Sequence, residues 1–211
     1  MKIKELYHGI FQLIYPNQKA LCKAMLRFQE HYESPAFAGE VFSLEDFKLW
    51  YIATSKRGIK TNKFTYYSDW NGGNFPDYVL TPFIKGKFDP LSKEEKQIIT
   101  AVKGIQHPKF YFVLTHEKKP QIIEHEIAHA LYYLDSSYKQ EVDTVFTDYL
   151  AHNLINIRKL FEAGYSNQVI ADELQAYTIC GASKLNLIFS KTIEHKIRSI
   201  FKKHLKSRPL L

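Results

Sequence analysis

The sequence predicts a single-domain α+β protein with a mixed first half and a helical second half. The chain has 211 residues, the size of one domain, with 45% hydrophobic and 24% charged residues, an ordinary globular composition. Aromatic and β-branched residues gather in the stretches 63–86 and 109–115. From Pro120 onward, apolar residues recur at helical spacing. No linker is evident, so we predict one domain over 1–211.

Within this domain we distinguish three parts: a mixed N-terminal part (1–108), a core (109–182) and a basic C-terminal helix (183–211). In the first part, residues 17–33 have the apolar spacing of a helix.

Capping patterns predict two more helices in the first part. Ser43 precedes LEDFKLWY as an N-cap with acids in the first turn. Ser92, with Glu95 three residues later, forms a capping box that begins a helix through about Lys103.

Two segments are predicted to be extended. The segment 63–86 contains Asn71-Gly72-Gly73 and prolines, so it is predicted as strands joined by a turn. The segment 109–115, KFYFVLT, is predicted as a strand.

Four helices are predicted after Pro120. The first contains residues 121–135, and the second runs from about 141 to 162. Ser166 can cap a third, 167–180, which Gly181 ends. The last spans about 183–206.

The net charge of +7 is concentrated at the C-terminus. From Lys184 to the end there are eight Lys and Arg residues and one acid, Glu194. Residues 1–183 hold the other 21 basic and 21 acidic side chains, so they are neutral overall. A basic tail can bind nucleic acid, anionic lipid or an acidic partner, or it can be the solvated face of a terminal helix.

Cys22 and Cys180 are the only cysteines, which excludes a disulfide framework and predicts a reducing, cytoplasmic location. No apolar run approaches the roughly 18 residues of a membrane-spanning helix, so no membrane partner is expected. Two lysines and apolar residues begin the chain, but Glu5, His8 and Pro16 interrupt them. We interpret this segment as mature protein rather than a signal peptide.

The segment QIIEHEIAHALYYLD, residues 121–135, places two histidines and a glutamate in one predicted helix. His125 and His129 are four residues apart, so both can reach one tetrahedral ion from one helix face. Glu126 can hydrogen-bond a water whose pKa a bound Zn²⁺ lowers, and can remove its proton. The pattern predicts a zinc-dependent hydrolase, and the alternative is three polar residues on a helix surface.

A catalytic zinc usually has three protein ligands. Glu173 in ADELQAY, 44 residues after His129, is the predicted third ligand, on a capped helix with the small Ala176 nearby. Three alternatives lie on the intervening helix, where charged residues more often face water: His152, Asp143 and Asp148.

HEIAH followed by DELQAY resembles the zincin metallopeptidases, in the gluzincin-like branch whose third ligand is a glutamate on a later helix. The resemblance covers about residues 109–180. It implies a small sheet over the metal-binding helix, with the C-terminal helices behind it. It implies peptide-bond hydrolysis with Glu126 as general base, and 109–115 resembles the edge strand that pairs with substrate. It implies three zinc ligands: His125, His129 and Glu173.

One residue departs from the family pattern. In thermolysin-like members, an acid one turn beyond the glutamate ligand orients the first histidine, and here that position is Tyr177. The Tyr177 hydroxyl could accept the imidazole N–H or face the reacting oxyanion, and we include it among the catalytic candidates. The surroundings also resemble compact zincins that cleave phage-type repressors or regulate stress responses.

Four other residues near the motif have ordinary structural interpretations. His116, after the predicted strand, could stabilise an oxyanion or be a surface loop histidine. Tyr132 and Tyr133 are expected to pack in the core rather than bind substrate. Cys180 is expected to be a small buried hydrophobic residue.

The predicted function is a zinc-dependent metallopeptidase acting on a peptide or protein substrate. Two alternatives stay open. One is a regulatory or binding protein with a vestigial zincin site, whose basic tail contacts nucleic acid or an acidic partner. The other is a non-peptidase zinc hydrolase that cleaves another amide with the same residues. The sequence does not define the oligomeric state.

Overall fold

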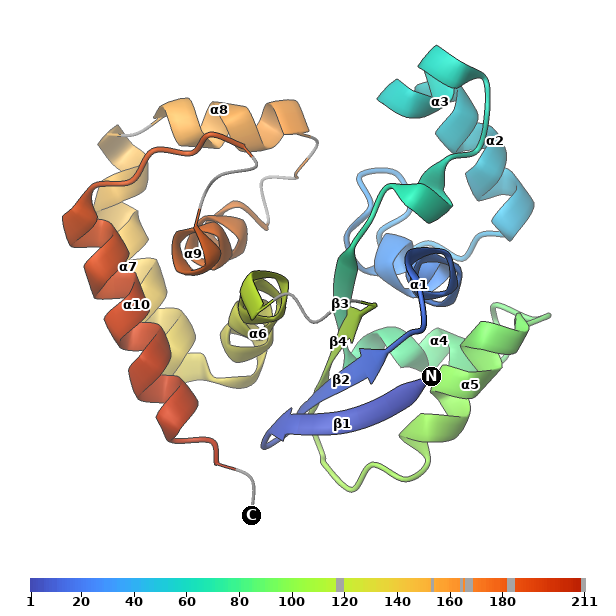
Figure 1. Ribbon diagram of the computed structural model, residues 1–211, viewed down its shortest axis with the longest axis horizontal. Coiled ribbons are helices and arrows are strands. Elements are labelled where there is room, and N and C mark those ends of the chain that lie inside the picture. The colour runs from blue at the N-terminus through green and yellow to red at the C-terminus, as the bar shows by residue number, and fades with distance from the viewer. Residues whose placement is uncertain (117–119, 153, 164, 166–168, 182–184, 210–211) are drawn as a thin grey trace.

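A mixed β-sheet separates two groups of helices (Figure 1). The computed structural model describes residues 1–116, 120–152, 154–163, 165, 169–181 and 185–209. The strands are β1 Lys2–Tyr7, β2 Ile10–Ile14, β3 Gly72–Pro76 and β4 Tyr111–Thr115. The helices are α1 Gln18–Glu33, α2 Leu44–Thr54, α3 Lys56–Thr61, α4 Thr81–Ile84, α5 Lys93–Val102, α6 Pro120–Leu134, α7 Ser136–His152, α8 Leu154–Ala163, α9 Ile170–Cys180 and α10 Lys191–Lys206. Two short 3₁₀ helices are η1 Tyr66–Ser68 and η2 Asp77–Leu80.

The sheet has the strand order β1-β2-β4-β3 in the described part of the chain. β1 and β2 form an antiparallel hairpin, β2 pairs with β4 in parallel, and β3 pairs with β4 antiparallel. The parallel register runs from Ile10 opposite Tyr111 to Ile14 opposite Thr115. This small mixed sheet and the helical second half confirm the predicted α+β class.

β4 is an internal strand, which corrects the expectation that the segment 109–115 is the substrate-pairing edge. It pairs with β2 on one side and with β3 on the other. All five residues of its apolar run YFVLT are buried, as expected for a strand covered on both faces. The neighbouring edge strand is β3.

The segment 63–86 contains less strand than predicted. Only β3 is extended, and 3₁₀ turns flank it before the short helix α4. Gly72 and Gly73 begin β3 instead of forming a turn. A Cβ on Gly72 would lie 2.8 Å from Ile122 Cγ2, and one on Gly73 would lie 2.6 Å from Met25 Sδ. These glycines therefore let α6 and α1 approach the strand closely.

The predicted helix starts in the first half are confirmed. Asn17, Ser43 and Ser92 are N-caps, and both hydrogen bonds of the Ser92–Glu95 capping box are present. No described helix is long and apolar enough to cross a membrane.

The helices of the second half differ from prediction in their ends. The expected helix over 141–162 is two helices, α7 and α8. α9 begins at Ile170, and the predicted cap Ser166 lies outside the described residues. α10 begins only at Lys191, where the Ser190 hydroxyl caps it.

Two hydrophobic cores lie on the two faces of the sheet. Because side chains alternate along a strand, Phe112 and Leu114 of β4 join one core with α1, and Tyr111 and Val113 join the other with α6. α6 contacts β3 and β4, α9 packs against α6, and α10 packs against α7 and α9 (Figure 1). The helix with the two motif histidines thus lies between the sheet and the C-terminal helices.

Asp135 joins α6, α7 and α10. Its Oδ1 accepts the backbone N–H groups of Ser137 (3.1 Å) and Tyr138 (3.0 Å), so it caps α7, and its Oδ2 lies 3.0 Å from His204 Nδ1. Burial raises the pKa of Asp135, but the hydrogen bonds from Tyr138, Ser137 and His204 outweigh it and lower this pKa to about 2.

Asp135→Asn is expected to reduce the free energy of unfolding at neutral pH by about 1 kcal/mol, because the amide still caps α7 but loses the charge facing His204. The folded pKa of about 2 lies below the ordinary 3.8. The carboxylate therefore stabilises the fold above about pH 4, and this contribution is lost as pH falls through about 2. Urea unfolding between pH 2 and 7 tests this. If the wild type and the variant differ in free energy of unfolding by the same amount at every pH in this range, the predicted contribution of the carboxylate is contradicted.

Candidate metal centre

α6 and α9 bring the three predicted metal ligands together. His125 and His129 lie one turn apart on α6, and their Nε2 atoms are 3.2 Å apart. Glu173 on α9 places Oε1 3.7 Å from His129 Nε2 and Oε2 3.8 Å from His125 Nε2. The fully buried Ala128 and Ala176 lie in the same core and leave room for close helix packing. The predicted set therefore converges in space.

The arrangement fits a tetrahedral zinc ion. Ligand atoms about 2.0–2.1 Å from zinc lie roughly 3.3 Å from one another, close to the 3.2–3.8 Å found between these atoms. Glu173 Oε2 is buried and has no hydrogen-bond partner, a costly state that a bound cation would relieve. Two imidazoles and a carboxylate suit Zn²⁺, and imidazole also suits copper, iron and nickel.

The charges around the site favour an added cation. Burial opposes a charge on His129, but the carboxylates of Asp172 and Glu173 outweigh it and raise the His129 pKa well above 6.5. Burial raises the pKa of Glu173 well above 4.5. A metal ion needs both groups in their deprotonated forms, so its binding would be linked to proton release.

Asp172, which the sequence analysis did not single out, orients His129. Its Oδ1 lies 2.9 Å from His129 Nδ1 and accepts a hydrogen bond from Gln175 Nε2 at 2.8 Å. Gln175 in turn accepts the Tyr138 hydroxyl at 2.6 Å. The carboxylate fixes the ring so that Nε2 faces the other ligands. The adjacent acids in ADELQAY are the only sequence signal for this role.

Tyr177 does not take the position of the orienting acid. Its ring packs edge-on against His125, with 4.8 Å between centroids, and its hydroxyl hydrogen-bonds the Tyr165 hydroxyl at 2.9 Å. Burial raises the pKa of Tyr177 to about 12, so this hydroxyl keeps its proton. Tyr165 was not predicted, and no sequence pattern links it to the site.

Cys180 lies beside the first histidine rather than acting only as a core residue. Its Sγ is 3.5 Å from His125 Nδ1, the ring nitrogen opposite the ligand atom. Burial raises the pKa of the Cys180 thiol to about 11, so it is protonated at neutral pH. It is therefore a neighbour of the ligand and not a thiolate nucleophile.

Glu126 is buried and directed at β3, outside the three-residue ligand group that the described residues form. Its Oε2 accepts a hydrogen bond from Asn74 Nδ2 at 2.5 Å, and Asn74 Oδ1 accepts the Tyr111 hydroxyl at 2.5 Å. A Cβ on Gly72 would lie 3.0 Å from Glu126 Oε1, so a larger residue here would crowd the carboxylate. The sheet thus holds the carboxylate beside the ligands.

Glu33 at the end of α1 adds a further acidic group near the site. It accepts a hydrogen bond from Gln29 Nε2, and Gln29 Oε1 accepts the Asn74 N–H at 2.9 Å. Burial raises the pKa of Glu33 to about 7, against the lowering effects of His129 and Gln29. α1 therefore contributes to the electrostatics of a site formed mainly by α6 and α9.

No protein-family model, curated protein or solved structure matches this chain. The interpretation of the site therefore depends on the geometry of its own residues.

Asp143, one of the three alternative ligands, does not belong to the described group. Asp143 accepts the Tyr132 hydroxyl and lies 2.5 Å from Lys139 Nζ. The side chains of His152 and Asp148 lie outside the described part of the chain.

Tyr132 and Tyr133 are partly buried and pack against the core on the α6 side of the sheet, as predicted. The Tyr133 hydroxyl also donates to Asp77 at 2.7 Å. His116 Nε2 lies 3.4 Å from Asn71 Oδ1, next to the start of β3.

Asp172→Asn is expected to weaken Zn²⁺ binding about 10- to 100-fold, because the neutral amide no longer fixes the orientation and basicity of His129. Competition with a chelating dye measures this affinity. Asp143→Asn removes an acid outside the ligand group and should bind zinc as the wild type does. Equal affinities of Asp172→Asn and wild type would contradict the orienting role.

Proposed function

We propose that this protein is a zinc-dependent hydrolase of the zincin type and that it cleaves peptide bonds. The convergence of His125, His129 and Glu173 between α6 and α9 carries the proposal. Two further features support it: a buried carboxylate, Glu126, beside the ligand group, and a small sheet that covers the ligand-bearing helix.

The side chains supply the parts that hydrolysis needs. Zn²⁺ held by the three ligands would polarise a carbonyl oxygen and lower the pKa of water in the site. In this proposal Glu126 would take a proton from the attacking water and pass it to the leaving amine. Asn74 keeps this carboxylate beside the ligands without joining them. The protonated Tyr177 hydroxyl is our candidate donor to the developing oxyanion.

The substrate class follows from the resemblance to zincins, and β3 limits how a peptide could bind. β3 is the edge strand beside Glu126, so an extended peptide would meet its free edge. At the centre of β3 the Asn74 N–H already donates to Gln29, and Pro76 has no N–H. We therefore propose that the substrate is held through a short segment rather than by pairing along the whole strand.

Both cysteines are free thiols, which supports a cytoplasmic location as part of the proposal. The same site residues would also serve a hydrolase that acts on a non-peptide amide, and substrate tests distinguish the two.

A second function, binding of nucleic acid or an acidic partner, is supported by the basic helix α10. With α7 it lines a groove of about 770 Å³ that includes Lys191, His195 and Lys196. α10 supplies no side chain to the described ligand group, so this binding would be independent of the metal centre. Such binding would weaken steeply with added salt.

Glu126→Gln is expected to bind Zn²⁺ with wild-type stoichiometry and to hydrolyse peptides about 10²- to 10⁴-fold more slowly, because the amide cannot accept the proton. Elemental analysis and a quenched-fluorescence peptide library measure the two properties. Glu124→Gln, an exposed neighbour on α6, is the matched control and should retain activity. Wild-type protein without zinc, or a Glu126→Gln variant with full turnover, would rule out the proposal.

Asn74→Asp is expected to shift the acidic limb of the kcat/KM profile to higher pH. A second carboxyl group next to Glu126 raises the pKa of the general base, because like charges disfavour the ionised form. Zinc content should stay unchanged. Asn74→Ala loses the hydrogen bond to the ionised Glu126 without adding a negative charge, so it should shift the limb in the same direction by less. A pH profile of Asn74→Asp identical to that of the wild type would show that Asn74 does not act on Glu126.

A further inference from the structure

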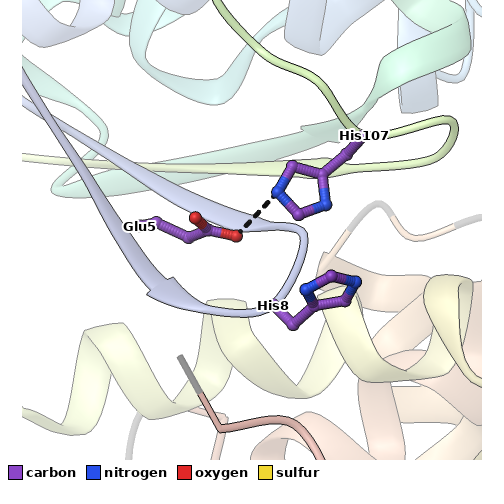
Figure 2. A group of neighbouring side chains, drawn as sticks. All are labelled: Glu5, His8 and His107. Atoms are coloured by element: carbon purple, nitrogen blue, oxygen red, sulfur yellow. Dashed lines mark ion pairs between the residues drawn. The ribbon is translucent and has the colours of Figure 1, made fainter. Parts of the chain in front are cut away.

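We propose a second binding site, for a divalent transition-metal ion, at Glu5, His8 and His107. The site lies where the β1–β2 turn meets the loop before β4, and it is formed by residues about a hundred positions apart in the chain (Figure 2). It is separate from the centre between α6 and α9 and does not depend on the proposed hydrolase function.

The three side chains already have the spacing of a ligand set. Each offers one ligand atom, and these atoms all lie within 4.8 Å of one another. Glu5 Oε1 is 3.0 Å from His107 Nε2, and the rings of His8 and His107 meet edge-on with 4.6 Å between centroids. Figure 2 shows the Glu5 carboxylate directed at the His107 ring, with the His8 ring beside it. Among the described residues, only this group and the α6–α9 centre have such an arrangement.

Backbone contacts hold the site in place without a metal. The Gly9 N–H donates to Glu5 Oε1 at 2.9 Å, and the Gly9 carbonyl accepts the Tyr111 N–H at 2.9 Å. Gly9 has a φ of +78°, which favours glycine at this turn. His107 also packs edge-on against Phe11, with 5.4 Å between centroids. Ligands held in this way lose little conformational entropy when they bind an ion.

The donor set and its exposure define the kind of ion. Two imidazoles and one carboxylate suit Zn²⁺, Cu²⁺ or Ni²⁺ rather than Mg²⁺ or Ca²⁺, which prefer oxygen ligands. The side chains of Glu5 and His107 are 30% and 17% exposed, and His8 is exposed, so solvent can complete the coordination.

We expect the ion to stabilise the attachment of the β1–β2 hairpin to β4. An ion here would link the β1–β2 turn to the loop that leads into β4. The same turn is contacted from the C-terminus, because Arg208 Nη1 donates to the His8 carbonyl at 3.1 Å. The bound ion would therefore stabilise the N-terminal edge of the sheet.

The test is the number of ions that the metal-stripped full chain binds. We expect isothermal titration with Zn²⁺, and with Co²⁺ as an absorbing probe, to give two ions for the wild type and one for His8→Ala/His107→Ala. His125→Ala should also bind one ion. If His125→Ala does not fold, Glu173→Gln takes its place in the experiment and should bind one ion. His31→Gln, at a histidine of α1 outside both ligand groups, is the matched control and should bind two.

A milder variant guards against loss of folding. Glu5→Gln keeps an oxygen acceptor for the Gly9 N–H and should weaken the second site at least tenfold with an unchanged circular dichroism spectrum. In the His125→Ala background, Zn²⁺ should raise the melting temperature, and adding His8→Ala should abolish that rise.

Wild type and the His8→Ala/His107→Ala variant binding equal numbers of ions with equal affinities would overturn the second site. If the only bound ion is lost in His125→Ala and retained in that double variant, the second site fails and the proposed hydrolase centre stands. If the only bound ion is retained in His125→Ala and lost in His8→Ala/His107→Ala, the second site is supported and the hydrolase proposal loses its basis.

Discussion

Buried negative charge between α6 and α9 is the constraint on which the rest of the structure depends. Asp172 and Glu173 lie next to each other on α9, and Glu126 on α6 is close enough to raise the pKa of both His129 and Glu173. Carboxylates are stable inside a protein only when they are paired or hydrogen-bonded. His129 and Gln175 satisfy Asp172, and Asn74 binds Glu126, but one Glu173 oxygen has no hydrogen-bond partner. A cation bound by the three candidate ligands would give that oxygen a partner.

The position of Glu126, the candidate general base, depends on the absence of side chains at the start of β3. β3 begins with two glycines, which let α6 approach one face and α1 the other. This close approach allows Asn74, a strand residue, to reach Glu126 on the helix. α1 also takes up part of the free edge through Gln29, so the helices on both faces of the sheet contribute to the site's surroundings. β3 thus contacts α6 and α1 and, through Asn74, reaches the surroundings of the candidate metal centre.

The two groups of two histidines and one glutamate offer the same candidate ligands in different environments. Between α6 and α9, the ligands are largely buried, an acid orients one imidazole, and a further carboxylate lies alongside. At the β1–β2 turn, the same residue types are more exposed and are held by backbone contacts. The first environment suits catalysis, because low solvent access strengthens electrostatic effects. The second suits a structural link between distant segments.

The choice of Glu173, 44 residues after His129, came from the resemblance to zincins, and only the structure places it beside the two histidines. The sequence by itself determined the local features: the caps at Ser43 and Ser92 and the spacing of His125 and His129. These features depend on the helical repeat and on residues three or four positions apart, so a linear pattern contains them. Only the tertiary structure decided that β4 is internal, that Asp172 rather than Tyr177 holds an imidazole, and that Asn74 holds Glu126. Each of these depends on strand order or on the rotation of one helix against another. Such contacts join residues tens of positions apart, and no local period specifies them.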